Sequence, residues 1–374
     1  MLHHLYQGNI PRRLFMSSDV YERLAAKLDE LPSGFPSTES GVELKILQKI
    51  FTPEEAELTL QMSPEPETIE VIAERFGKPE PEMQAILDDM MRKGHIGSAV
   101  IAGQWMYKMI PFVIGIYEYQ LNRIDKELAV LFEEYLPTFA REVGSIKPAL
   151  MRVVPVKKQI KAELSVPRYD DLRSMVNEAK SFLLLECICR KERALEGHRC
   201  THSLETCLGF ASEEGAFDGY PRGRGISKEQ AIEVLNGAEE AGLVQSAYNI
   251  QEGHHNHVCL CCSCCCGLLR GLKGFKAPYL VGKGSFRASI NQDTCSACGV
   301  CAEERCPMEA IVETDSGYEV LTERCIGCGV CTPTCPTDSI TLIQRPEAGL
   351  DTPPVNMKEW SKERTANRRK RKVI

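Results

Sequence analysis

The first 186 residues of this sequence contain no cysteine, and all 18 cysteines lie between Cys187 and Cys335. Many thiols in one chain usually mean either disulfides or metal ligands. Disulfide frameworks belong to small secreted domains, whereas this chain has 374 residues and does not begin with the basic and apolar regions of a secretory signal. Adjacent cysteines such as Cys261 and Cys262 also cannot bridge without strain. We therefore expect reduced thiols that bind metal in the cytoplasm.

Long apolar runs and nucleotide-binding fingerprints are also missing. The longest apolar stretch is interrupted by Gln104, Lys108 and Pro111, so we expect no membrane span. The glycine-containing residues 223–225 and 282–284 neither follow a predicted strand nor open a helix. The sequence therefore gives no support for flavin or nicotinamide binding, and it identifies no small-molecule substrate.

Helical periodicity dominates the amino-terminal part of the chain. Thr52 and Glu55 form a capping box that begins one helix, and Gly94 marks the end of the last one. Residues 1–41 are expected to be a loosely structured extension with a linker at 31–37. Helices are predicted over 19–31, from 42, from 52, over 66–76 and over 79–93, and strands over 96–101 and 105–110. This order resembles a winged helix-turn-helix domain over residues 42–112.

The charge of this winged-helix-like domain argues against nucleic-acid binding. Residues 42–112 contain twelve Asp and Glu against seven Lys and Arg, whereas DNA binding needs cations that neutralise phosphates. We expect a protein-interaction or dimerisation domain instead, which leaves a homo-oligomer open. The basic residues near the end of the segment 346–374 are expected to form a solvated, disordered tail that could hold an acidic partner.

Two further segments precede the repeat near the carboxyl terminus. Residues 113–180 are predicted to be a helical connector, with helix over 113–150, a strand over 152–156 and a helix that ends near Leu185. Residues 181–285 form a central cysteine-rich region with a predicted helix over 227–242.

An internal repeat near the carboxyl terminus is the strongest pattern. In each copy three cysteines are separated by two residues each, and a Cys-Pro pair follows. The first copy contains Cys295, Cys298, Cys301 and Cys306, and the second contains Cys325, Cys328, Cys331 and Cys335. Each copy is predicted to be a short strand, a ligand loop and a short helix opened by Cys-Pro. Small residues in the loops let backbone amides approach the sulfur atoms.

The repeat resembles the bacterial two-cluster ferredoxins over about residues 286–345. The resemblance implies two [4Fe–4S] clusters, each held by three cysteines of one copy and the Cys-Pro cysteine of the other. One cluster would be held by Cys295, Cys298, Cys301 and Cys335, and the second by Cys325, Cys328, Cys331 and Cys306. The sequence departs from the family at residues 302–305, which are four where three are usual, but we expect Cys306 to reach its cluster. A zinc ribbon, the alternative, leaves half of these thiols unexplained.

Ten further thiols occupy the central region. They are Cys187, Cys189, Cys200, Cys207, Cys259, Cys261, Cys262, Cys264, Cys265 and Cys266. Their pattern resembles iron–sulfur proteins of anaerobic bacteria and archaea in which Cys-x-Cys-Arg precedes Cys-x-Cys-Cys-x-Cys-Cys-Cys, and this likeness over about 150–345 implies electron transfer. One or two further clusters are expected, with the first four cysteines as one candidate set that the later run could complete or replace. A pair of zinc sites or a structural thiol patch is the alternative.

Charged and histidine side chains stand beside these thiols. Histidine can replace a thiolate ligand, as in Rieske-type centres, but we interpret His254, His255 and His257 as solvated loop residues. Arg190 and Arg270 either offset the charge of a cluster or are surface charges.

We therefore predict an α+β multidomain protein: a winged-helix-like amino-terminal domain, a cysteine-rich central α/β region and a two-cluster ferredoxin module. Its expected function is to relay single electrons through [4Fe–4S] clusters to or from a partner oxidoreductase in anaerobic metabolism. An electron carrier or oxidoreductase subunit is favoured over a stand-alone enzyme, so no catalytic residue is assigned. A redox-sensing transcriptional regulator that uses the winged helix is the alternative.

Overall fold

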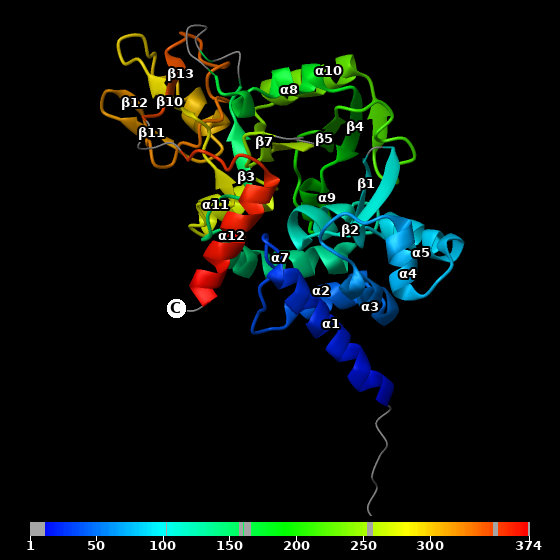
Figure 1. The fold of residues 1–374 in the computed structure, drawn as a ribbon. Coiled ribbons are helices and arrows are strands. Elements are labelled where there is room, and N and C mark those ends of the chain that lie inside the picture. Colours follow the sequence, from blue (N-terminus) through cyan, green and yellow to red (C-terminus); the bar gives the residue numbers. More distant parts are fainter. Residues whose placement is uncertain are drawn as a thin grey trace, which may run out of the picture. The chain divides into compact units, whose positions relative to one another are not determined.

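The computed structural model describes residues 12–101, 103–156, 160, 166–252, 257–346 and 351–372. The chain divides between Ile116 and Tyr117 into two compact units, and each is described by itself. Both contain helices and strands (Figure 1), which confirms the predicted α+β class. No helix in the described ranges is long and apolar enough to cross a membrane.

The first unit consists of helices followed by a β-hairpin. Its elements are α1 (Arg12–Glu30), α2 (Val42–Ile50), α3 (Pro53–Gln61), α4 (Ile69–Phe76), α5 (Glu80–Lys93), β1 (Ile96–Ile101) and β2 (Gln104–Met109). The predicted capping box of Thr52 and Glu55 begins α3, and Gly94 ends α5 with a φ of 75°. The predicted helices and strands of this unit are thus confirmed, with shifts of a few residues at most ends. Helix α1 begins at Arg12, well before the predicted start at residue 19.

Helix α1 and the segment after it belong to the core of the first unit. Leu24 and Leu28 of α1 are fully buried, and Phe35 is 1% exposed. The Phe35 ring lies 4.4 Å from the ring of Phe112. The segment predicted to be a linker is therefore packed, because its apolar side chains cover the helices of this unit. Residues 1–11 of the expected extension lie outside the described residues.

A seven-stranded sheet organises the second unit, in the order β6-β4-β5-β8-β7-β3-β9. The strands are β3 (Met151–Val154), β4 (Ser181–Glu186), β5 (Glu205–Ala211), β6 (Arg224–Ile226), β7 (Val244–Tyr248), β8 (His257–Cys261) and β9 (Val281–Gly282). Neighbouring strands are antiparallel except β3 and β9. The helix predicted to end near Leu185 is present as α8 (Leu172–Glu178) but ends earlier. Leu185 itself lies in β4, because a short continuous apolar run fits a strand covered on both faces.

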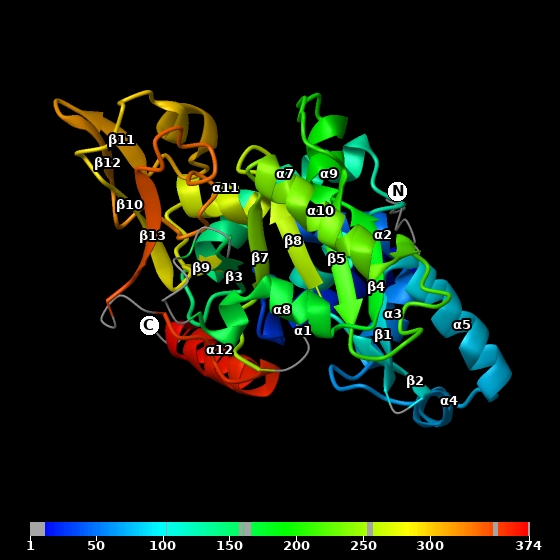
Figure 2. The same cartoon turned by 90° about the horizontal axis from the view of Figure 1, so that it is seen from above.

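Helices cover both faces of this sheet. They are α7 (Lys126–Val143), α8 (Leu172–Glu178), α9 (Ile188–Leu195), α10 (Lys228–Glu240) and α11 (Gly267–Gly274). Helices α8 and α10 lie side by side over one face (Figures 1 and 2), and their apolar side chains form a core with the strands that also contains Cys262 and Cys265. The predicted helix over 227–242 is confirmed by α10. The helix predicted over 113–150 is confirmed in part, as the short α6 (Tyr117–Tyr119) and as α7, whereas the backbone from Val113 to Gly115 is not helical.

The repeat forms two small antiparallel sheets from β10 (Phe286–Ile290), β11 (Ile311–Thr314), β12 (Gly317–Val320) and β13 (Ile340–Gln344). Strand β10 pairs with β13, and β11 pairs with β12. Each copy therefore contributes strand, loop and strand, and the two copies pair with one another. The short helix predicted after each Cys-Pro is wrong, because the residues after Cys306 and Cys335 form turns that lead into a strand.

The basic carboxyl-terminal segment is a packed helix, α12 (Met357–Lys372), and not the disordered tail predicted from its charge. Trp360, Arg364 and Arg368 of this helix are at most 7% exposed. The indole nitrogen of Trp360 donates to the carbonyl of Ala149 at 2.8 Å. These buried contacts, which composition alone does not reveal, hold α12 to the second unit.

Candidate metal centres

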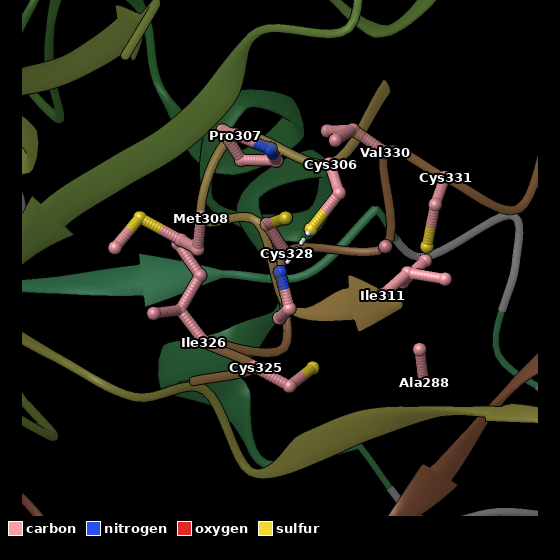
Figure 3. Close-up of a pocket in the computed structure, with 12 residues that line it drawn as sticks. Ala288, Cys306, Pro307, Met308, Ile311, Cys325, Ile326, Cys328, Val330 and Cys331 are labelled. Atoms are coloured by element: carbon pink, nitrogen blue, oxygen red, sulfur yellow. Dashed lines mark hydrogen bonds between the residues drawn. The ribbon is translucent and has the colours of Figure 1, made fainter. Parts of the chain in front are cut away.

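Two cavities lie within the repeat, and each is lined by four cysteines. The inner cavity is lined by Cys306, Cys325, Cys328 and Cys331 (Figure 3). The outer cavity is lined by Cys295, Cys298, Cys301 and Cys335. Each cavity thus gathers three cysteines of one copy and the Cys-Pro cysteine of the other. This is the grouping that the ferredoxin resemblance implies.

The two cavities differ in their exposure to solvent. Cys325, Cys328 and Cys331 of the inner cavity are 6–8% exposed, whereas Cys298 of the outer cavity is exposed. The inner ligand loop is joined to the segment that follows β3, because the Val156 amide donates to the Cys328 carbonyl at 3.1 Å. The inner cavity is therefore the better shielded from water.

Backbone amides point at the last thiol of each copy. The amide of Ala310 lies 3.2 Å from Cys306 Sγ, and the amide of Ser339 lies 3.3 Å from Cys335 Sγ. Burial opposes the ionisation of Cys335, but hydrogen bonds from this stretch of backbone outweigh it and lower the pKa of the thiol. In Cys335 this geometry favours the thiolate, which is the form of cysteine that binds metals.

The extra residue of the first copy is absorbed by a wide turn. The Cys306 amide donates to the Cys301 carbonyl at 3.1 Å, whereas the Cys335 amide of the second copy reaches back only to Thr332. Arg305 at the end of this wide turn donates to the Val330 carbonyl at 3.0 Å. Cys306 consequently lines the inner cavity despite the longer spacing.

Close backbone approach within the ligand loops is clearest at Gly327. Its φ is 79°, and a Cβ atom there would lie 2.1 Å from the Phe286 carbonyl oxygen. The equivalent position of the first copy is Ala297, which adopts a φ of 52° in the exposed outer loop. Glycine is therefore required by packing in the second loop, whereas the first loop accommodates a side chain.

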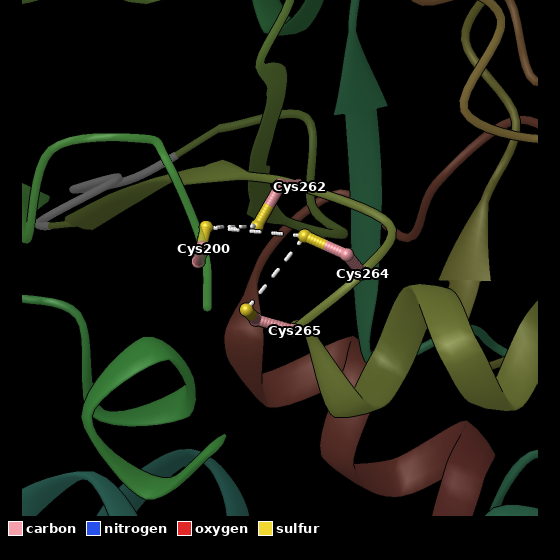
Figure 4. A group of neighbouring side chains, drawn as sticks. All are labelled: Cys200, Cys262, Cys264 and Cys265. Carbon is pink, nitrogen blue, oxygen red and sulfur yellow. Dashed lines mark hydrogen bonds between the residues drawn. The ribbon is translucent and has the colours of Figure 1, made fainter. Parts of the chain in front are cut away.

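Four of the central cysteines lie close together, and we call them the four-thiol group (Figure 4). It consists of Cys200, Cys262, Cys264 and Cys265, whose Sγ atoms all lie within 4.8 Å of one another. Cys200 follows α9, and the other three lie in the turn between β8 and α11. Within this distance Cys200 is grouped with the later run of cysteines and not with Cys187, Cys189 and Cys207 of the candidate set.

The remaining central cysteines are linked by pairwise contacts, and we call them the six-thiol group: Cys187, Cys189, Cys207, Cys259, Cys261 and Cys266. Cys189 interacts with Cys187 and Cys266, and Cys261 interacts with Cys259 and Cys266. His257 was expected in a solvated loop, but it lies in β8 with Nε2 2.9 Å from Cys207 Sγ and 3.5 Å from Cys259 Sγ. His254 and His255 lie outside the described residues.

Charged side chains set the electrostatics of the central thiols. Arg190 is 1% exposed and contacts Cys262, so it is no surface charge. A hydrogen bond from Cys265 and the charge of Arg190 lower the pKa of Cys262 to about 4. Burial and the neighbouring Cys189 raise the pKa of Glu192 to about 9, so this carboxyl is neutral near pH 7. Sequence reasoning missed Glu192, since nothing in its local pattern marks it as buried.

A comparison with protein families finds a match within the second copy of the repeat. Residues 318–341 match the family of 4Fe-4S binding domains. The protein contains an iron–sulfur-binding domain. The matched segment begins in β12, includes the loop of Cys325, Cys328 and Cys331, and ends in β13. Soft thiolates around an enclosed cavity fit a cluster of this kind.

Proposed function

We propose that this protein is a cytoplasmic iron–sulfur electron carrier that relays single electrons to or from a partner oxidoreductase in anaerobic metabolism. The observation that supports this proposal is the pair of cavities, each lined by three thiols of one copy and one thiol of the other. In the proposal each cavity holds one [4Fe–4S] cluster, which supplies one-electron chemistry when bound. The chain's own residues hold the thiolates, direct amides at sulfur and keep water from the inner cavity.

The outer cavity is the proposed point of electron exchange with the partner. Its thiol Cys298 is exposed, whereas the inner loop is buried, and electron transfer between proteins becomes faster as their centres come closer. In this proposal the six-thiol group holds a third cluster with Cys187, Cys189, Cys261 and Cys266 as its ligands. The contacts that link Cys189, Cys261 and Cys266 support this choice.

The amino-terminal helices and hairpin are proposed to form a winged-helix-like domain that binds protein. The cations of the α5 region are already neutralised. Lys78 pairs with Glu82, and Lys93 lies 2.6 Å from a carboxylate oxygen of Glu55. Paired cations contribute little to phosphate binding. This favours a protein partner, or a second copy of the chain, over nucleic acid.

Electron exchange with a charged acceptor tests the proposal. The reduced holoprotein is mixed anaerobically with ferricyanide, and reoxidation is followed by absorbance. Asp293→Lys, at an exposed position two residues before Cys295, should speed reoxidation severalfold at low salt, because the acceptor is an anion. Glu229→Lys, exposed on α10, is the matched control and should leave the rate near that of the original protein. Equal effects of both variants, or a protein that dithionite does not reduce, would contradict the proposal.

A further inference from the structure

The four-thiol group is more compact than either cavity of the repeat. Cys200 Sγ lies 3.8 Å from Cys262 Sγ and 3.9 Å from Cys264 Sγ, and Cys264 Sγ lies 3.7 Å from Cys265 Sγ (Figure 4). Among the residues that the structure describes, this is the one group of three or more His, Cys, Asp or Glu ligand atoms that all lie within 4.8 Å of one another. The cysteines of the two cavities are therefore spaced more widely.

These distances match thiolates that share a single ion. A tetrahedral zinc ion binds thiolate sulfur at about 2.3 Å, which places the four sulfur atoms about 3.8 Å apart. In a [4Fe–4S] cluster each thiolate binds a different iron, so the ligand sulfur atoms stand farther from one another. The compact geometry therefore separates this group from a cluster site.

We propose that Cys200, Cys262, Cys264 and Cys265 bind one zinc ion in a closed structural site. Four thiolates fill the tetrahedral shell and leave no position for substrate, as in structural zinc sites. The inference goes beyond the proposed electron-transfer function, because zinc carries no electrons. It assigns four of the ten central thiols to a task other than cluster binding and leaves the six-thiol group for iron.

The position of the group explains what the ion would stabilise. Cys200 lies in the loop between α9 and β5, and its three partners lie in a turn closed by a 3.1 Å hydrogen bond from the Cys266 amide to the Cys262 carbonyl. Cys262 and Cys265 are buried at the edge of the sheet core. One ion therefore ties a loop with little regular structure to the end of β8.

Arg190 binds the same two segments and supplies charge beside the site. Its guanidinium donates to the Ser203 carbonyl at 2.8 Å and to the Leu260 carbonyl at 3.0 Å. A zinc ion with four thiolates has a net charge of about −2. A buried cation in contact with Cys262 offsets part of that charge.

Zinc X-ray absorption on the intact holoprotein, expressed with both iron and zinc supplied, tests the proposal without any substitution. The expected result is about one zinc per chain with four sulfur ligands at about 2.3 Å. Cys200→Ser and Cys264→Ser should each lose the zinc and keep the iron and sulfide content unchanged. Ser263→Ala, which alters the same turn and removes no thiol, should keep the zinc.

Three results would overturn the assignment. The first is a holoprotein without zinc, or with nitrogen or oxygen ligands around it. The second is loss of about four irons and their sulfide in both cysteine variants, which would mean a cluster site. The third is one iron without sulfide in this position. None of them bears on the two cavities of the repeat, whose iron content is measured separately.

Discussion

Cys306 and Cys331 line the same cavity although they belong to different copies of the repeat. This sharing of cysteines between copies follows from the strand pairing, because β10 of the first copy pairs with β13 of the second copy. Neither copy alone can therefore line a cavity of the repeat with four cysteines. We expect cluster binding and folding of residues 286–344 to be coupled, as in other small metal domains.

Pairs of cysteine substitutions test whether each cavity of the repeat takes its fourth cysteine from the other copy. Cys306→Ser and Cys325→Ser act on the inner cavity, so the double variant should lose no more iron than either single variant, about four atoms at most. Cys306→Ser combined with Cys295→Ser acts on both cavities and should lose about eight atoms. Iron and acid-labile sulfide per chain are the measurement. Additive losses for Cys306 and Cys325 would show that they serve different clusters.

Substitution of Gly327 should damage the inner cavity selectively. In Gly327→Ala the new methyl group would meet the Phe286 carbonyl oxygen at 2.1 Å, and the positive φ adds a penalty of about 1 kcal/mol or more. We expect lower thermal stability and loss of the inner cluster's EPR signal. Ala297→Gly, at the equivalent outer position, should change stability by less than about 1 kcal/mol. A Gly327→Ala protein with both clusters intact would refute the steric argument.

The charge of Arg345 should raise the reduction potential of the inner cluster. Arg345 is 6% exposed, and its guanidinium donates to the Gly284 carbonyl at 3.0 Å and the Cys325 carbonyl at 2.5 Å. A cation stabilises the more negative reduced state. Arg345→Gln should lower the potential by an amount on the order of 1 kcal/mol, roughly 40 mV for one electron.

Arg345→Lys separates charge from hydrogen bonding in this test. It keeps the cation, so its potential in an EPR-monitored redox titration should stay close to that of the original protein, while the lost fork geometry lowers stability. A potential unchanged in Arg345→Gln would exclude the electrostatic role.

Arg364 should stabilise the second unit through the end of α7. It donates to the carbonyls of Val143 at 2.7 Å and Ile146 at 2.5 Å, and to that of Pro148. Arg364→Met removes the buried side-chain donor from all three carbonyls, of which that of Val143 still accepts from the Ile146 amide at 3.3 Å. The substitution should lower the free energy of unfolding by about 2 to 4 kcal/mol. Arg369→Met, exposed on the same helix, should change it by less than about 0.5 kcal/mol. If both variants lowered the free energy of unfolding equally in chemical denaturation, α12 would stabilise the second unit only through its net positive charge.

Local patterns in the sequence were sufficient for several features. The spacing of Cys325, Cys328 and Cys331 follows from the shape of a cluster, so the loop could be predicted from the sequence. The capping box of Thr52 and Glu55 likewise acts within one turn of helix. Such features depend on residues close in the chain. The structure confirms the capping box, and the family match includes the cysteine loop.

Features that depend on distant residues could not be predicted in the same way. Cys200 lies with Cys262 because the sheet places the loop after α9 beside the end of β8, which no spacing rule expresses. The basic run near Arg364 looks like a solvated tail until the carbonyls at the end of α7 are known. The apolar run around Leu185 is compatible with a buried helix and with a buried strand. Its pairing with the neighbouring strand β5 makes it a strand.

The most direct test of the central claim is iron and acid-labile sulfide per chain on anaerobically purified protein, with EPR after reduction by dithionite. Two clusters in the repeat and one in the six-thiol group predict about twelve irons and as many sulfides, with interacting signals from the reduced protein. About eight irons would confine the clusters to the repeat. Four or fewer, or no signal on reduction, would contradict the two-cluster carrier.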